Sequence, residues 1–275
     1  MTNVKILVCA HKMAQIPTNK YFYPIQVGAN LSDIKLPFIP DNTGDNISSK
    51  NLNYCELTAM YWAWKNLKDV DIIGLNHYRR YFDFNNKYPL ISPEFSFIDS
   101  KDFLQSDYKF PDLEELLSKY DIVLSAYSCH PISISKQYCL FHIANDWEIL
   151  HNVIKALSPE YDNAFVQTMD KSNRMSDFNM FITNWDIFNK YCQWLFMILF
   201  ETERRVYISQ YSDQARIFGF MSERLLNVFC EKEKLRIKYI PTVMPLDNFR
   251  KWMNTPNLSY FLRRIRYNIA FKIAY

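Results

Sequence analysis

The clearest group of residues with binding chemistry in this sequence is the basic run His77-Tyr78-Arg79-Arg80. In an extended chain, neighbouring side chains point to opposite sides, so one arginine can face a ligand while the other contacts protein. Guanidinium groups bind phosphate oxygens through paired hydrogen bonds and stay charged at any working pH. The run therefore predicts a phosphate-binding site, and a structural ion pair on a loop is the alternative.

Two further segments carry groups that suit a phosphate or a nucleobase. His11 and Lys12 follow the first apolar run, where a solvated loop is an equal alternative. The segment 41–50 is rich in Asn and Asp, which favour turns and offer many hydrogen-bonding groups. We predict a loop ordered by ligand, with Asp45, Asn46 and Lys50 as its contacts.

A metal ion has less support in the sequence. The acidic pair Asp41 and Asp45 offers oxygen ligands of the kind that Mg²⁺ or Mn²⁺ prefers, but such residues more often only build a turn. No H-E-x-x-H or comparable motif is present. We therefore assign no metal ligand and expect no metal to be required.

Several carboxylates are candidates for a general base. A carboxylate at the mouth of a sheet can take the proton of an acceptor hydroxyl, and the order along the chain favours Glu223, then Asp213, then Asp177. A charge pair between Glu223 and Arg224 on a helix surface is the alternative. Glu56 joins the ligand-binding candidates, although a capping box that closes its own helix start explains it equally simply.

The composition excludes several common classes of enzyme. The chain has 275 residues, and 17% of them are aromatic. Its four glycines are too far apart for a dinucleotide fingerprint, a Walker loop or a nucleophile elbow. The six cysteines form no C-x-x-C pair, which predicts free thiols in a cytoplasmic protein. A net charge of +3 is too small to predict a nucleic-acid partner.

The elements that must position these residues alternate between strand and helix patterns. We predict strands at 4–10, 71–75, 120–126, 178–183 and 235–240, and helices at 53–66, 143–157, 185–203 and 216–231. This order indicates an α/β sandwich with a mostly parallel sheet and a helical C-terminal part. Ligands of such sheets bind beyond the carboxyl ends of the strands, where the basic run and His11 fall.

The last residues form a separate unit in this interpretation. We predict one domain over 1–250, followed by a basic amphipathic tail over 251–275 that contains aromatic residues and no acid. Such a segment is typical of a helix lying on an anionic membrane surface. A terminal helix docked on the core is the alternative. We read no signal peptide and no membrane span, so we expect a cytoplasmic protein, which the tail would bring to the inner face of the cell membrane.

Several blocks of the sequence resemble the bacterial domain-of-unknown-function family 4422, which occurs in capsule and exopolysaccharide loci and is regarded as a family of glycosyltransferases. The blocks span most of residues 4–231. They are Asp45-Asn46-Ile47-Ser48, Lys50-Asn51, Tyr54-Cys55-Glu56-Leu57-Thr58, Tyr61-Trp62-Ala63-Trp64-Lys65-Asn66, Gly74-Leu75-Asn76-His77-Tyr78-Arg79-Arg80-Tyr81-Phe82, Asn179-Met180-Phe181, Tyr191-Cys192-Gln193-Trp194-Leu195-Phe196 and Glu223-Arg224-Leu225.

The resemblance implies a GT-A-like nucleotide-sugar fold and transfer of a hexose from a UDP-sugar to a growing, lipid-linked surface glycan. Some relatives are similar to β-galactofuranosyltransferases, so galactofuranose is one expected sugar. Enzymes of the GT-A type usually carry an Asp-x-Asp metal motif where this chain has His77-Tyr78-Arg79-Arg80. This departure suggests that arginine charge replaces Mn²⁺ at the diphosphate, although Asp83 just beyond keeps a metal open.

Two other classes of function remain open at this stage. A non-catalytic glycan- or lipid-binding module of a polysaccharide assembly system would use the aromatic residues as sugar-stacking platforms. An RNA-binding protein would use basic and aromatic residues together, but the small net charge makes it the weakest reading.

Overall fold

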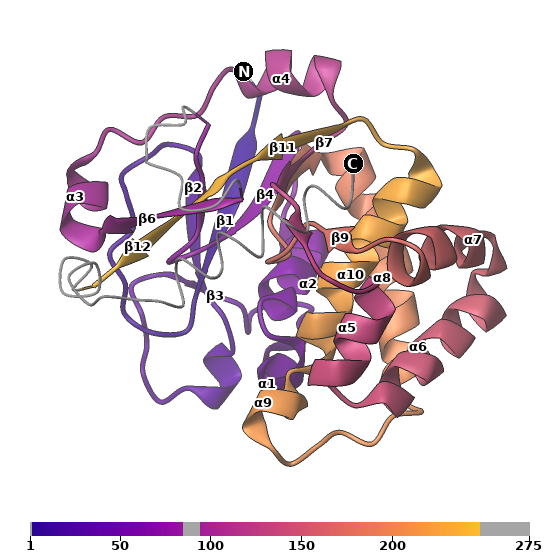
Figure 1. Cartoon of the computed structure of the whole chain (residues 1–275). Coiled ribbons are helices and arrows are strands. Elements are labelled where there is room, and N and C mark those ends of the chain that lie inside the picture. The colour runs from indigo at the N-terminus through magenta and orange to yellow at the C-terminus, as the bar shows by residue number, and fades with distance from the viewer. Residues whose placement is uncertain (1, 85–93, 248–275) are drawn as a thin grey trace, which may run out of the picture.

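The structure, a computed structural model, describes residues 2–84 and 94–247. The predicted tail at 251–275 lies outside these residues. The described part of the chain is built around one large sheet with its helices gathered mainly on one side (Figure 1).

Seven strands make up the central sheet. They are β1 (Val4–Ala10), β2 (Phe22–Gln26), β3 (Ile39–Pro40), β4 (Ile72–His77), β7 (Ile122–Ser125), β10 (Phe181–Asn184) and β11 (Ile237–Ile240). Their order across the sheet is β11-β7-β10-β4-β1-β2-β3. Strand β10 runs antiparallel to both neighbours, while the other pairs are parallel. The predicted mostly parallel α/β sheet is confirmed.

The central strand β1 is apolar throughout because both of its faces are buried. Leu7 and Cys9 face the larger core beneath the helices, whereas Ile6 and Val8 face the opposite side. A strand covered on both faces reads as a continuous apolar run rather than an alternating one. The sequence therefore located β1 at its observed bounds.

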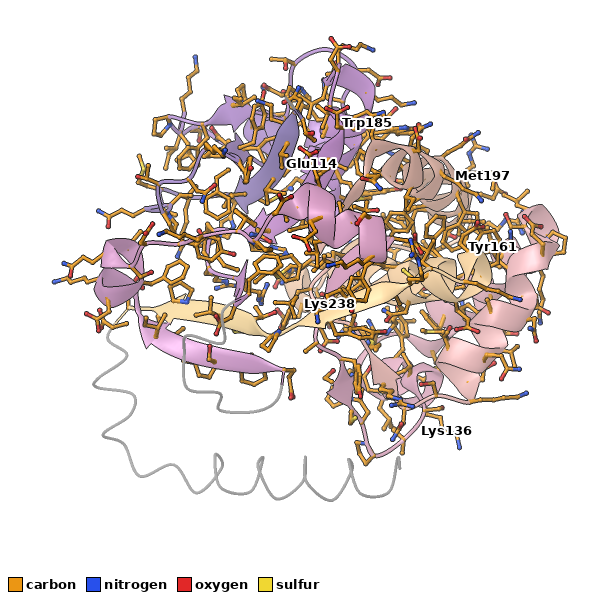
Figure 2. All side chains as sticks on the ribbon, turned by 90° about the horizontal axis from the view of Figure 1, so that it is seen from above. Glu114, Lys136, Tyr161, Trp185, Met197 and Lys238 are labelled. Carbon is orange, nitrogen blue, oxygen red and sulfur yellow. The ribbon has the colours of Figure 1, made fainter. Side chains whose placement is uncertain are left out.

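Helices cover the sheet mainly on the face of the larger core. The helices are α1 (Asn51–Tyr54), α2 (Leu57–Asn66), α3 (Ser100–Gln105), α4 (Leu113–Lys119), α5 (Ile134–Phe141), α6 (Ala144–Leu157), α7 (Asp162–Phe165), α8 (Trp185–Glu203), α9 (Ser212–Ala215) and α10 (Ile217–Glu233), with short turns η1 (Ala29–Leu31), η2 (Ser48–Lys50), η3 (Pro159–Tyr161) and η4 (Val166–Asp170). In Figure 2, Trp185 and Met197 mark the course of α8, and Tyr161 lies beside it, where its ring stacks on Trp194 at 4.3 Å.

The other face of the sheet is covered by α4 and by a small second sheet. Its strands are β5 (Tyr81–Phe82), β12 (Thr242–Leu246) and β6 (Phe95–Asp99), in the order β5-β12-β6. A two-stranded pair, β8 (Ser128–Cys129) with β9 (Arg174–Met175), extends from the end of β7. These short strands were not predicted, because two to five residues are too few for a periodic pattern.

The structure corrects the sequence-based prediction in three places. Strands β2 and β3 lie between the first predicted strand and the loop at 41–50, where no element was predicted. The helix expected over 53–66 is broken into α1 and α2 at Cys55, whose φ is 51° and ψ −129°. Glu56 consequently makes no capping hydrogen bond to its own helix, so the capping-box interpretation is wrong.

Candidate active site

The candidate site lies where the carboxyl ends of β1 and β4 meet. The chain runs from β1 outward to β2 and β3 and then returns to β4 on the other side, and such a reversal opens a crevice at the carboxyl edge of a sheet. Cys9 pairs with His77 in the register of the two strands, and the Tyr78 amide donates to the Cys9 carbonyl at 3.0 Å. The basic groups after β1 and those at the end of β4 therefore share one edge, as predicted.

The outer part of this edge is formed by basic side chains around the ring of Tyr78. His11 meets the ring edge-on at 5.5 Å between centroids, and the cationic groups of Lys12 and Arg79 lie 5.8 Å and 5.7 Å from its centroid. Partial burial lowers the pKa of His11, and the charges of Lys12, Arg79 and Arg216 lower it further. We call His11, Lys12 and Arg79 the basic rim. Lys12 and Arg79 supply its positive charge, because the lowered pKa keeps His11 neutral.

The two arginines of the basic run have different surroundings, as the sequence suggested. Arg79 is exposed on the rim. Arg80 turns inward, and its guanidinium lies 4.5 Å from the centroid of the Phe178 ring. Burial and the neighbouring Arg79 lower the pKa of Arg80, while Glu223 and Glu56 raise it. Arg80 thus lies between the basic rim and a group of acids.

The turn that precedes β10 brings the inner part of the site together. Because β10 is antiparallel to its neighbours, its amino-terminal end lies at the edge where β1 and β4 have their carboxyl ends. Phe178 and Asn179 adopt left-handed backbone angles, with φ of 76° and 55°. A non-glycine residue pays a conformational cost there, and such strain is concentrated at functional sites.

This turn contacts His77 directly. The Phe178 carbonyl lies 2.7 Å from Nε2 of His77. A carbonyl only accepts, so Nε2 carries the proton and the neutral ring presents Nδ1 as an acceptor. Burial lowers the pKa of His77, which keeps the ring neutral at working pH.

The same turn also fixes Glu56. The Asn179 side-chain amide donates to Oε1 of Glu56 at 2.6 Å and to Oγ of Ser222 on α10 at 2.8 Å. Glu56 is buried, and its direction is set by the unusual backbone of Cys55. Gly219 of α10 lets the two segments approach, because a Cβ there would lie 3.0 Å from the Cys55 sulfur.

Arg216 closes the site from the start of α10. Its Nε donates to the sulfur of Cys55 at 3.3 Å, and its charge acts on Glu56, Glu223, Arg80 and His11. Burial and the charge of Glu56 raise the pKa of Cys55 to about 12, so the sulfur accepts this hydrogen bond as a neutral thiol. Arg216 therefore extends the positive charge of the rim toward the acids.

Two further carboxylates lie beyond Arg80. Burial, together with the nearby charge of Asp177, raises the pKa of Glu223 to about 7. Burial also raises the pKa of Asp177, although its carboxylate accepts a 2.6 Å hydrogen bond from Ser128. A carboxyl group with a pKa near neutrality is suited to proton transfer at working pH.

His130 and Arg224 complete the acidic side. The pKa of His130 is lowered by burial and raised in part by Asp177. Arg224 is buried; it donates to the Phe220 carbonyl at 2.8 Å and to Gln137 at 2.6 Å. Its charge lowers the pKa values of both Glu223 and Asp177, so it balances these two acids.

The chain matches the family model described as Domain of unknown function (DUF4422) over residues 5–234. It belongs to this family. The site described above, from His11 to Arg224, falls within the matched residues.

A solved structure supports the same relationship. The apo structure of WbbM, a bifunctional glycosyltransferase, is similar to this chain with a TM-score of 0.76 and 26% sequence identity. The match covers 90% of this chain and 46% of WbbM, so the chain spans less than half of that protein. No curated protein sequence matches the chain. Together with the sheet topology, this similarity confirms the GT-A-like fold.

The site unites most of the residues chosen from the sequence. His11, Lys12, His77, Arg79 and Arg80 share the edge formed by β1 and β4. The acids Glu56, Asp177 and Glu223 lie around Arg80, and their charges act on one another or on Arg80.

Four chosen residues lie elsewhere. Asp45 accepts a hydrogen bond from Tyr61 of α2 at 3.2 Å, and Asn46 donates to the Gly44 carbonyl within its own turn. Lys50 pairs with Glu203 of α8 at 2.5 Å. Asp213 is exposed on α9, and it is absent from the charges that act most on Arg80 and Glu223.

Asp41 builds the fold. Its two carboxylate oxygens accept from the amides of Gly28 and Ala29 at 2.8 Å and 3.0 Å, and Ser48 also donates to it. Gly28 has a φ of 66°, which suits glycine at this turn. Within residues 2–84 and 94–247, no group of three or more His, Cys, Asp and Glu side chains is placed to hold a metal ion.

Sequence reasoning missed the residues that hold the site together. Asn179, Phe178 and Arg216 were not chosen, since their roles depend on backbone angles and on contacts with residues far along the chain. One indication was that Asn179 falls in a block resembling the family, and another was its place next to Asp177 at the edge of the predicted sheet. No helix in the described part of the chain is long and apolar enough to cross a membrane.

Proposed function

We propose that this protein is a glycosyltransferase that moves a sugar from a UDP-sugar to a glycan acceptor. Membership of the DUF4422 family and the similarity to WbbM support this proposal. The single observation that carries it is the arrangement at the carboxyl edge of the sheet. There, the inward-facing Arg80 lies between a basic rim and carboxylates that include Glu223.

In this proposal the cationic groups bind the diphosphate of the donor. Arg79, Arg80 and Arg216 offer guanidinium groups that match phosphate oxygens in geometry and charge. Their positive charge stabilises the negative charge that develops on the departing diphosphate. Lys12 and His11 extend the same surface outward, where the nucleoside would lie.

Glu223 acts as the general base of the transfer. The acceptor hydroxyl oxygen forms a bond to the anomeric carbon as the bond between that carbon and the phosphate oxygen breaks. The bonding electrons leave with UDP, and the acceptor proton passes to Glu223. A pKa of about 7 gives Glu223 a substantial carboxylate fraction at neutral pH and enough basicity to take this proton.

We further propose that arginine charge takes the place of a divalent cation. The acids of the described part do not form a group of three suited to a metal, and Glu56, one of the acids near Arg80, is already held by Asn179. This arrangement supports charge compensation by arginine, and no step of the transfer is assigned to a metal.

The finer assignment rests on the family resemblance. We propose a hexose as the transferred sugar, with galactofuranose as the first candidate, and a growing lipid-linked capsular, exopolysaccharide or O-antigen glycan as the acceptor. The protein would then work at the inner face of the cell membrane. The same cationic groups would also bind the phosphates of a sugar donor whose nucleoside is not uridine.

A thermal-shift titration with UDP, first in EDTA and then in Mn²⁺, tests the donor site. A ligand at about 100 times its Kd stabilises a protein by roughly 2.7 kcal/mol, which raises the melting temperature by several degrees in a chain of this size. We expect this rise in EDTA. A rise that needs Mn²⁺ would restore the metal and refute the arginine substitution. If UDP, GDP and CMP all fail to raise the melting temperature, the nucleotide-sugar proposal falls and a glycan- or lipid-binding module takes its place.

A further inference from the structure

Two hydrogen-bond acceptors in the candidate site are left open by the described residues. Asn179 donates to Oε1 of Glu56, and Nε2 of His77 donates to the Phe178 carbonyl. Within residues 2–84 and 94–247, no hydrogen bond reaches the second oxygen of Glu56, Oε2, or the second ring nitrogen of His77, Nδ1. The fully buried polar atoms that lack a partner in these ranges belong to other side chains, so both acceptors still reach solvent. A ligand can therefore reach them too.

The two acceptors lie close together because one turn holds both side chains. Phe178 and Asn179 are consecutive, so their Cα atoms are about 3.8 Å apart. The first contacts His77 at 2.7 Å and the second contacts Glu56 at 2.6 Å. Apart from burial, which lowers the pKa of His77, the charge of Glu56 has the largest effect on that pKa. Acceptors placed this closely suit two neighbouring donors of one ligand.

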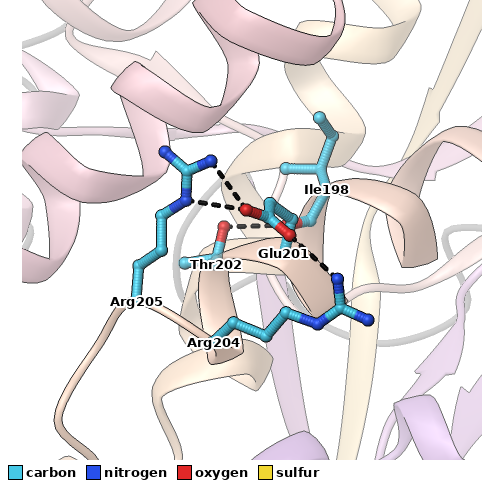
Figure 3. Close-up of polar contacts among 5 residues, drawn as sticks. All are labelled: Ile198, Glu201, Thr202, Arg204 and Arg205. Carbon is cyan, nitrogen blue, oxygen red and sulfur yellow. Dashed lines mark hydrogen bonds and ion pairs between the residues drawn. The ribbon is translucent and has the colours of Figure 1, made fainter.

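Glu201 of α8 offers a comparison with Glu56, because it also lies near two arginines. Figure 3 shows that both oxygens of Glu201 are paired, one with Arg204 at 3.2 Å and the other with Arg205 at 2.6 Å and 2.8 Å. The charge of Glu56 likewise acts on two arginines of the site. In the described part of the chain, however, the ion pairs of arginine are made with other acids. Glu56 therefore keeps one oxygen that no guanidinium group occupies.

A ligand that fits these acceptors must bring hydrogen-bond donors and no negative charge. A diphosphate offers acceptors and negative charge, so the buried carboxylate of Glu56 repels it. Uracil carries a single N–H between two carbonyl oxygens, which leaves one of the two acceptors without a donor. Hydroxyls on neighbouring carbons of a sugar ring are neutral and each can donate. Because a buried polar group is costly to leave unpaired, sugar hydroxyls match the pair best.

We infer that Oε2 of Glu56 and Nδ1 of His77 bind two neighbouring hydroxyls of the transferred sugar. The inference rests on the proposed function, in which arginines hold the diphosphate of the donor and Glu223 takes the acceptor proton. The charge of Glu56 acts on Arg80, Arg216 and Glu223. Glu56 is thus near the leaving group and near the base, and the transferred sugar must lie next to both. These two acceptors then select the donor by its sugar rather than by its nucleotide.

Two substitutions remove the open acceptors and keep the contacts that hold each side chain. In Glu56→Gln, the amide oxygen still accepts from Asn179, and an amide nitrogen takes the place of Oε2. In His77→Gln, the amide nitrogen takes the place of Nε2 and still donates to the Phe178 carbonyl, while Nδ1 has no counterpart. The matched control is Glu201→Gln, which makes the same change in a carboxylate of α8 that is paired with two arginines outside the site.

The test is calorimetric titration of the full chain with UDP and with UDP-galactofuranose, UDP-galactose and UDP-glucose. For the UDP-hexose that the wild type binds most tightly, Glu56→Gln should raise Kd about ten- to hundredfold, because a hydrogen bond to a charged group is lost. His77→Gln loses a neutral acceptor and should raise it about two- to tenfold. The Kd for UDP should not rise in Glu56→Gln, since a negative charge beside the arginines is removed. Glu201→Gln should leave every Kd unchanged.

The comparison between UDP and the UDP-hexose separates the possible roles of Glu56. A purely structural role, or a contact with the ribose, would weaken the binding of both ligands together, and that result would overturn the inference. An unchanged affinity of Glu56→Gln for the UDP-hexose would also overturn it and would assign the open oxygen to the acceptor side. In both cases UDP binding by the wild type leaves the proposed function standing. If the wild type binds neither UDP nor any UDP-hexose, transfer from a UDP-sugar is refuted and the sugar subsite with it.

Discussion

The basic rim and the carboxylate side of the site are built in contrasting ways. The rim side chains His11, Lys12 and Arg79 lie around one tyrosine ring and are exposed. On the other side, Glu56 is buried and bound by Asn179, and Asp177 is bound by Ser128. Strained backbone at Cys55, Phe178 and Asn179 sets the positions of these groups.

The difference suggests a division of work. An exposed cation can adjust to a charged ligand that binds and dissociates, since water solvates the cation while no ligand is bound. A proton-transfer group must instead be held in place before the reaction, because the cost of arranging it would otherwise add to the barrier. The rim is thus suited to binding and the carboxylate side to chemistry.

The largest effect that this comparison predicts is on turnover. Glu223→Gln removes the proton acceptor while keeping the shape, and should lower kcat by about 10²–10⁴ with the affinity for UDP nearly intact. Steady-state kinetics with a UDP-sugar measure this. The control is Asp213→Asn, which changes an exposed carboxylate of α9 outside the cluster. Unchanged turnover in the Glu223 variant would move the base to another carboxylate, with Asp177 next.

A smaller effect, of about 10²–10³ on kcat/KM, is expected for Arg80→Ala, because a fixed cation at the departing diphosphate is lost. Arg79→Ala should cost less, since Arg79 is exposed and solvent screens its charge. The UDP thermal shift should shrink in the same order. An Arg79 variant that is the more damaged of the two would reverse the roles assigned to the basic run.

The smallest effect concerns pH. Burial raises the pKa of Glu223 to about 7, so the carboxylate that accepts the proton becomes more abundant as the pH rises. From pH 6 to pH 8 its fraction changes from about 9% to about 91%, so the rate should rise about tenfold. In Glu223→Gln the residual rate should lack this rise. A wild-type profile that is flat over this range would contradict the raised pKa.

Much of the fold could be predicted from the sequence, because its strongest patterns arise locally. The continuous apolar run of β1 and the helical pattern of α8 gave the observed bounds of both elements. The weaker strands β2 and β3 were missed, since β2 is half-buried and contains Pro24, and β3 has only two residues. Pattern alone could not identify them.

The candidate site was predictable only in part. The basic run could be recognised from its residue types. The rule that ligands bind beyond the carboxyl ends of parallel strands placed it beside His11. Glu56, by contrast, had a sound local explanation as a helix cap, and a contact with a residue 123 positions away overrode it. Asp45 and Lys50 were chosen for their residue types, but Tyr61 and Glu203 bind them. Such partners are set by tertiary packing.

Strand β10 also has a consequence for how the molecule assembles. It joins β4 to β7, and so links the two halves of the sheet, although it follows β4 by about a hundred residues of chain. Until β10 has been synthesised, β4 has a row of unpaired backbone N–H and C=O groups along one edge, and such an edge pairs readily with other chains. Joining distant segments in this way slows folding. Strand β10, whose amino-terminal turn organises the site, therefore also protects a nascent chain from aggregation once it pairs with β4.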